Sequence, residues 1–103
     1  MNITENDVIL KIEEYLQGKI SRFDIELWAR DIDNLKDDGK LTYQSIEVEE
    51  AIDDLVVIDE YEPGSIFEAL KLRDKKIEVP DSMYSITRDD ALQLISTLKN
   101  NKN

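Results

Sequence analysis

The fold is decided by one short stretch, Gly18-Lys19-Ile20-Ser21-Arg22-Phe23-Asp24-Ile25. Ser21 can accept a hydrogen bond from the first turn of a helix and Asp24 can accept one in return, which is the pattern of a capping box. Gly18 stands where a left-handed residue would end the preceding helix. Because only a few residues join the two helices, we expect them to pack as an antiparallel hairpin.

Apolar residues at helical spacing extend to both sides of this turn. The first helix should run from about residue 5 to 17 with Thr4 as its cap, and the second from Ser21 to just before Asp38-Gly39. The apolar faces are Val8, Ile9, Ile12 and Leu16 in the first helix, and Ile25, Trp28, Ala29, Ile32 and Leu35 in the second.

A third helix is expected from about residue 43 to 60, with Thr42 as its cap. Its clearest apolar stripe is Val48, Ile52, Leu55 and Val56. The run from Leu55 to Ile58 is apolar throughout and could be a strand, but the long helical pattern favours a helix. Glu62-Pro63-Gly64 should end it, because proline lacks the amide donor that a helix needs.

The last helix opens with Ile86-Thr87-Arg88-Asp89-Asp90, the same capping pattern as in Ile20–Asp24. Shared capping chemistry explains this likeness better than an internal repeat. The sequence leaves the conformation of residues 63–85 open, with a short helix at 66–72 and a short extended segment near 75–80 as suggestions. We therefore expect a mainly all-α bundle of four to five helices, with residues 1–103 forming a single helical domain.

The sequence contains neither histidine nor cysteine. It therefore lacks the side chain whose pKa lies nearest neutrality and the strongest nucleophile at neutral pH. The three glycines, at positions 18, 39 and 64, stand too far apart for a phosphate-binding loop. We expect no enzyme activity, no catalytic residue and no cofactor, and a carboxylate-based hydrolase is the weakest alternative.

Residues 34–45 resemble the calcium-binding loop of an EF-hand, with Gly39 at the glycine position. However, Lys36 places a cation where an oxygen ligand belongs. Ser45, at the last position, cannot supply the bidentate carboxylate on which such a loop relies. A turn that ends a helix is the better explanation, so we expect no metal.

The formal net charge is −11, from 24 acidic and 13 basic side chains. Such a charge repels nucleic acids and anionic membranes and attracts basic protein surfaces. We therefore expect a basic protein partner, with no direct binding to nucleic acid and no membrane contact. The alternative is that the acidic surface only keeps the protein soluble.

The sequence also predicts where the protein acts. No segment approaches the roughly 18 consecutive apolar residues of a membrane span. Residues 1–5 have neither the basic segment nor the apolar run of a secretory signal. Together with the absence of cysteine, this favours the cytoplasm, and a mature extracellular chain is the alternative.

The acidic side chains are concentrated in one stretch. Eight lie between residues 47 and 62, with no lysine or arginine among them, and four more lie between residues 31 and 38. Like charges at helical spacing repel one another, and carboxylates at a helix C-terminus oppose its dipole, so this arrangement costs stability. Such costs are expected where function requires them. The predicted partner-binding residues are Glu47, Glu49, Glu50, Asp53, Asp54, Asp59, Glu60, Glu62, Asp37, Asp38, Tyr43 and Tyr61.

Residues 12–24, followed by Trp28-Ala29, resemble the start of small bacterial immunity proteins of the colicin D and contact-dependent-inhibition type. The likeness covers roughly the first 35 residues. It implies a helical bundle that neutralises a cognate nuclease toxin by occupying its active-site cleft. The resemblance identifies no individual toxin-contacting residue, so the acidic candidates rest on charge alone.

The sequence therefore favours an immunity protein that binds a basic toxin domain directly. A dense row of carboxylates can imitate a nucleic acid backbone and cover the basic cleft of a nuclease. The alternative is a non-catalytic helical adaptor or regulatory interaction module. The sequence does not determine the toxin, the mode of inhibition or the oligomeric state.

Overall fold

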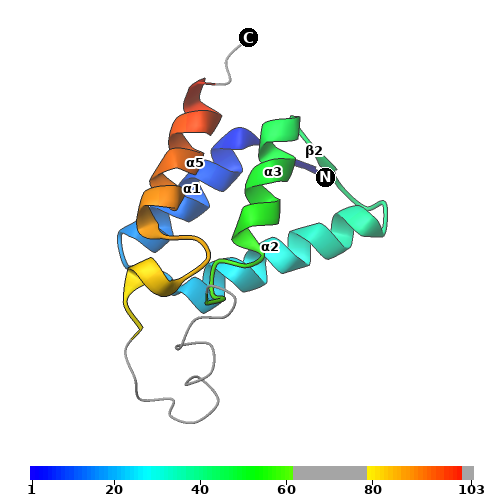
Figure 1. Ribbon diagram of the computed structural model, residues 1–103. Helices are drawn as coiled ribbons and strands as arrows, with labels where there is room; N and C mark the ends of the chain where they lie inside the picture. Colours follow the sequence, from blue (N-terminus) through cyan, green and yellow to red (C-terminus); the bar gives the residue numbers. More distant parts are fainter. Residues whose placement is uncertain (62–78, 101–103) are drawn as a thin grey trace.

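The computed structural model describes residues 1–61 and 79–100. Four α-helices make up most of this part of the chain, which confirms the mainly helical fold (Figure 1). The elements in chain order are β1 (Asn2–Ile3), α1 (Glu5–Leu16), α2 (Arg22–Asp37), β2 (Thr42–Tyr43), α3 (Ile46–Leu55), the 3-10 helix η1 (Asp81–Met83) and α5 (Arg88–Asn100).

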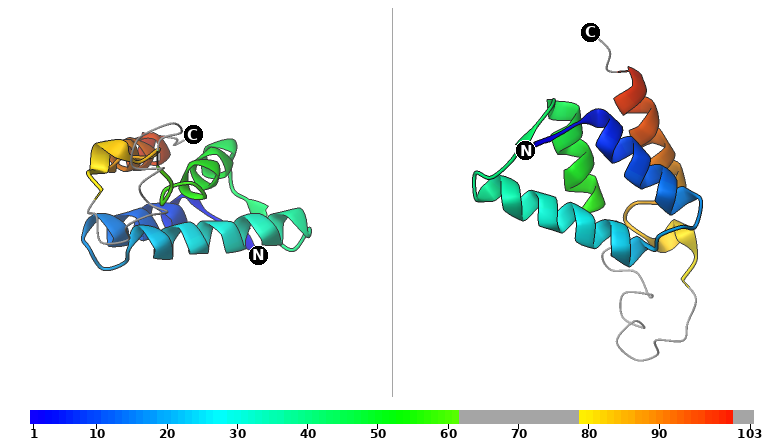
Figure 2. Two further views of the ribbon diagram at one scale, coloured as in Figure 1. Left: turned by 60° about the horizontal axis from the view of Figure 1, so that its bottom comes forward. Right: turned by 180° about the vertical axis from the view of Figure 1, so that it is seen from behind.

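The four helices form two layers. Figure 2 shows α1 and α2 running in opposite directions in one layer, with α3 and α5 lying over them. The helix α3 contacts the other three, whereas α1 packs chiefly on α5 and α2 chiefly on α3. The largest fully buried side chains of the core are Ile12, Ile25, Ile52, Leu55, Ile58, Val8 and Val48.

Local capping chemistry sets the helix boundaries as the sequence predicts. Capping boxes open α1, α2 and α5, with the N-cap amide donating to a carboxylate three residues later in each. The distances are 2.9 Å for Thr4 to Asp7, 3.0 Å for Ser21 to Asp24 and 2.9 Å for Thr87 to Asp90. Gly18 and Gly39 follow α1 and α2 with φ of 77° and 74°, a conformation that side chains with a Cβ rarely adopt.

The expected third helix is wrong at both ends. Thr42 does not cap it, because Thr42–Tyr43 forms a parallel pair with Asn2–Ile3. The cap is Ser45, whose Oγ accepts from the Val48 amide at 3.3 Å. A β-branched residue and an aromatic residue favour the strand, and the strand partner lies about forty residues earlier, where helical periodicity cannot reveal it.

At its other end, α3 stops at Leu55 instead of continuing to residue 60. The amides of Val57, Ile58 and Glu60 bond to carbonyls three residues earlier, so the chain continues in turns. These turns place Ile58 in the core with no exposed surface. The apolar run 55–58 is therefore explained by burial and not by a longer helix. The carboxylates of residues 59 and 60 lie beyond the end of α3.

Several predictions fall on residues that the structure does not describe. The stop at Glu62-Pro63-Gly64, the short helix at 66–72 and residues 101–103 lie outside the described residues. So does most of the extended segment expected near 75–80, and its last two residues, Val79 and Pro80, form no strand.

Arg22, the first residue of α2, joins three segments that are far apart in the sequence. Its Nη1 donates to the carbonyl oxygens of Ile58, at 2.6 Å, and Ile86, at 2.7 Å. Its Nη2 pairs with the Asp81 carboxylate, and its guanidinium lies 3.7 Å from the centre of the Tyr84 ring. Only 12% of the Arg22 side chain is exposed. The start of α2 is thereby tied to the turn after α3 and to the segment before α5.

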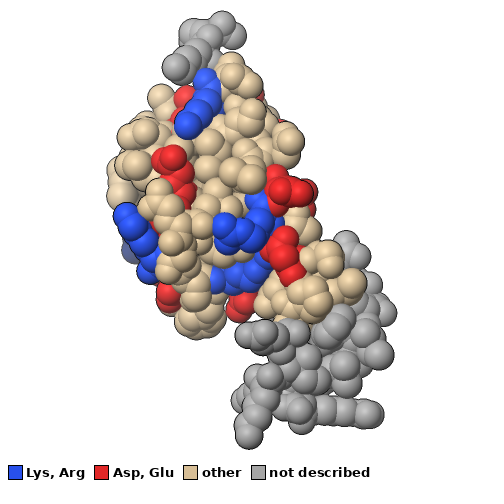
Figure 3. All heavy atoms as spheres, turned by 90° about the vertical axis from the view of Figure 1, so that its left-hand side faces the viewer, with Lys and Arg blue, Asp and Glu red and all other residues tan. Residues whose placement is uncertain are grey.

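Arg88, in the matching capping segment, also binds Asp81. Its amide donates to both Asp81 carboxylate oxygens at 3.1 Å, and its Nη2 donates to the Leu16 carbonyl at 2.7 Å. Both guanidinium groups lie 5.6 Å from the centre of the Tyr15 ring. The side of the molecule shown in Figure 3 accordingly carries basic side chains interspersed with acidic ones.

We predict that Arg22→Gln lowers the free energy of unfolding by about 2–4 kcal/mol, because it leaves two carbonyls without their donor and removes the ion pair with Asp81. Chemical denaturation of the full chain measures this. Arg30→Gln on the same helix is the matched control. Arg30 is 48% exposed and pairs with Glu26 and Glu60, so its loss should cost less than about 0.5 kcal/mol. Equal losses in the two variants would contradict the role given to Arg22.

Candidate protein-binding surface

The helix α3 turns one face to the core and presents carboxylates on the remainder. Val48, Ala51, Ile52 and Leu55 are buried, and they recur at the spacing of one helical face. Glu50 and Asp53 are exposed, and Glu49 and Asp54 are half-buried on either side of them. The predicted acidic face of this helix therefore exists, with its carboxylates directed towards α2 on one side and α5 on the other.

On the side of α2, carboxylates from two helices surround one tyrosine. Burial raises the pKa of Tyr43 to about 12, and the nearby negative charges of Asp33, Asp53, Glu49 and Asp37 contribute to the rise. Two of these carboxylates come from α2 and two from α3. The two acidic stretches that are separate in the sequence are therefore neighbours around Tyr43.

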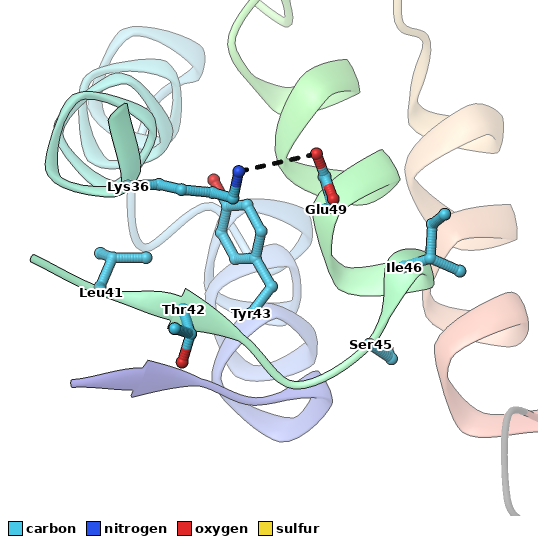
Figure 4. A pocket seen from close by; sticks show the side chains of 7 residues that line it. All are labelled: Lys36, Leu41, Thr42, Tyr43, Ser45, Ile46 and Glu49. Carbon is cyan, nitrogen blue, oxygen red and sulfur yellow. Dashed lines mark ion pairs between the residues drawn. The ribbon is translucent and has the colours of Figure 1, made fainter. Parts of the chain in front are cut away.

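Tyr43 also lines a depression between α2 and α3, which we call the α2–α3 depression. Its volume is about 430 Å³, and its lining residues are Lys36, Leu41, Thr42, Tyr43, Ser45, Ile46 and Glu49 (Figure 4). The Lys36 Nζ lies 5.5 Å from the centre of the Tyr43 ring and 3.9 Å from Glu49 Oε1. The Tyr43 hydroxyl oxygen is buried and has no hydrogen-bond partner among the described residues.

On the side of α5, the acidic surface continues to a third helix. Burial raises the pKa of Asp54, and the charges of Asp53, Asp90 and Glu50 raise it further. Asp90 belongs to the first turn of α5, where it completes the capping box with Thr87. The acidic surface, defined here by Asp33, Asp37, Glu49, Glu50, Asp53, Asp54 and Asp90, therefore crosses three helices.

The predicted residues beyond α3 are engaged in the fold. The Asp59 amide donates to Glu26 Oε1 at 3.0 Å, and Glu60 pairs with Arg30 at 3.1 Å. Tyr61 forms an isolated bridge with Tyr84, with ring centres 5.2 Å apart. These three residues therefore lie apart from the carboxylates around Tyr43, and Glu62 lies outside the described residues.

The remaining predicted residues lie at the two ends of the surface. Asp38 is exposed at the C-cap of α2, and Glu47 is half-buried in the first turn of α3. The sequence-based selection omitted Asp33, Lys36 and Asp90. Asp33 and Asp37 are four residues apart on one helix, a spacing that could have paired them. No local pattern brings Asp90 to α3, because that contact depends on the packing of the helices.

The EF-hand-like stretch is divided between the end of α2, a turn and β2, in agreement with the interpretation as a helix-terminating turn. Within residues 1–61 and 79–100, no group of three acidic side chains is arranged to hold a metal ion. Among the helices described, none combines the length and apolar character needed to cross a membrane.

Comparison with protein-family models, curated proteins and solved structures finds no match for this chain. The resemblance of residues 12–24 to immunity proteins therefore stays a prediction, and the function is argued from the surface itself.

We predict that Tyr43→Phe raises the free energy of unfolding by about 1 kcal/mol, because it removes a buried hydroxyl that has no partner and keeps the packed ring. Chemical denaturation at neutral pH is the measurement. A loss of stability in this variant would show that the hydroxyl has a stabilising partner.

We predict that Asp54→Asn stabilises the protein at neutral pH, raising its melting temperature by about 2–5 °C. Because the pKa of Asp54 is raised in the folded state, folding favours the protonated form of this side chain. The wild type therefore loses stability relative to the asparagine variant as the pH rises through that pKa. The gain from asparagine should therefore vanish below the ordinary pKa of an aspartate, in melting curves recorded across the acid range.

Asp24→Asn is the control of opposite sign. Its pKa is lowered by the hydrogen bonds from Ser21, so its contribution is present at neutral pH and lost as the pH falls through the lowered value. This variant should be less stable than the wild type at neutral pH and equal to it in acid. The same sign of change for both variants would contradict the assignment.

Proposed function

We propose that this chain is a non-catalytic binding protein whose acidic surface across α2, α3 and α5 recognises a basic protein. The observation that carries the proposal is the convergence of carboxylates from three helices on one surface. The mutual repulsion of these carboxylates lowers the stability of the fold. A lysine at any of these positions would reduce that repulsion. Such a cost is expected where a surface is used.

The partner that fits best is a nuclease toxin domain, with this chain acting as its cytoplasmic immunity protein. A nuclease cleft is lined with cations that bind phosphates, so a compact set of carboxylates is complementary to it. The likeness of residues 12–24 to immunity proteins supports the same choice. Without histidine or cysteine in its sequence, the chain has few groups suited to catalysis at neutral pH.

An adaptor that assembles through an apolar contact is the second candidate. Phe23 and Leu27 lie one helical turn apart on α2 and are 60% and 47% exposed. Two adjacent apolar side chains on a helix can form the centre of a small interface. Binding of this kind would tolerate charge reversal on α3.

We predict that Glu50→Lys slows association with a cognate basic toxin domain by about tenfold at low salt, since steering depends on the summed charge at the contact. Surface plasmon resonance measures the association rate, and inhibition of nuclease activity provides a second readout. The melting temperature should be unchanged or slightly higher, because a repulsive carboxylate is removed.

Glu14→Lys on α1 is the matched control. It changes the net charge by the same amount, but Glu14 lies on α1, which contributes no carboxylate to the acidic surface; there it pairs with Lys11 at 3.3 Å and lines a depression with Trp28. It should slow association much less than Glu50→Lys does. Equal effects of the two variants, or binding that neither variant changes, would contradict the proposed surface. Loss of binding in Phe23→Ser alone would favour the adaptor.

A further inference from the structure

We propose that the α2–α3 depression binds an arginine side chain of the basic partner, and that Lys36 occupies the position of that arginine in the free protein. This inference rests on the proposed function and specifies where the partner is anchored. Three observations support the inference. A cation, the Lys36 ammonium, already lies in the depression; it is held weakly; and the depression contains polar groups that it does not bind.

The first support is that the depression already holds a positive charge. The Lys36 ammonium lies 5.5 Å from the centre of the Tyr43 ring and 3.9 Å from Glu49 Oε1 (Figure 4). An aromatic face beside a carboxylate is a common arrangement for binding a cation. The chain's own lysine therefore shows which chemical class the depression accepts.

The second support is that Lys36 is held weakly. Its distance to Glu49 is at the outer limit for an ion pair, and the two side chains are 38% and 46% exposed. Exposed pairs of this kind contribute little to stability. Lys36 has a long flexible stem, so its ammonium can move into the solvent without any change in the backbone of α2.

The third support is that the depression contains groups that an ammonium does not satisfy. The Tyr43 hydroxyl is buried and has no partner among the described residues. The Lys36 Nζ lies beside the same ring, 5.5 Å from its centre, so an arginine that replaced Lys36 would approach this hydroxyl (Figure 4). Glu49, whose side chain is 46% exposed, can accept from a donor that approaches in the plane of its carboxylate.

A guanidinium matches these groups better than an ammonium does. It is planar, so it can lie on the Tyr43 ring, and its donors are arranged to bond both oxygens of a carboxylate such as Glu49. The hydroxyl of Tyr43 can accept a further N–H. Ile46, which is 64% exposed at the rim, can cover the methylene stem of an arginine.

The size and surroundings of the depression agree with this occupant. A volume of about 430 Å³ lies within the usual range of small ligand sites. Asp33, Asp37 and Asp53 lie near enough to raise the pKa of Tyr43, and the same negative charges would stabilise an incoming cation. The positive charge of Lys36 opposes that cation, so the lysine acts as an internal competitor.

The test uses a fluorescently labelled nona-arginine peptide and the full chain at low salt, with the dissociation constant measured by anisotropy. Lys36→Gln should tighten binding about fivefold more than Lys40→Gln does, because it also removes the competitor. Lys40 is exposed just beyond α2, so the control removes the same charge from the same end of the helix. Tyr43→Phe, which keeps the ring, should weaken binding about threefold through loss of the acceptor.

Each outcome decides for or against the site. Equal effects of Lys36→Gln and Lys40→Gln would overturn it, and so would nona-lysine binding as tightly as nona-arginine. If Glu50→Lys still weakens the peptide complex in that case, the proposed function stands and only the arginine site fails. If nona-arginine does not bind the wild type at all, both proposals fail together.

Discussion

A guanidinium with only 12% of its side chain exposed is stable when its donors are satisfied, and Arg22 meets this condition through contacts to two distant segments. Because these contacts include the carbonyl just after α3, the start of α2 cannot move independently of the end of α3. The pairing of β1 with β2 constrains the other end of the same two helices. The distance between α2 and α3, on which the acidic surface depends, is therefore set from both ends.

The parts of the fold that follow from local chemistry could be predicted from the sequence. The capping boxes at Thr4, Ser21 and Thr87 need only residues within one turn, and so do the left-handed glycines that follow α1 and α2. The third helix was predicted wrongly where the deciding contact is distant. Threonine is common both at helix N-caps and in strands, so the local sequence around Thr42 fits either. Its pairing with Asn2, forty residues earlier, makes it a strand residue.

The candidate site divides in the same way. The carboxylates of α3 and their opposition to the apolar face follow from helical spacing, so Glu49, Glu50, Asp53 and Asp54 could be identified in advance. Their neighbours could not, because Asp90 comes near enough to raise the pKa of Asp54 only through the packing of α3 and α5. Glu60 and Tyr61 are close to α3 in the chain, but their side chains contact Arg30 and Tyr84, which helical spacing does not reveal.

The arginines explain how so acidic a surface persists in a stable fold. Each of the three described arginines, at positions 22, 30 and 88, is bound to carbonyls or carboxylates of its own chain. These arginines lie at the junction of α2, η1 and α5 and beside the turn after α3. None of them lies on α3 itself. Charge is consequently uneven over the described residues, because α3 carries five carboxylates and no lysine or arginine. For the basic partner that we propose, this uneven charge would orient the encounter before contact.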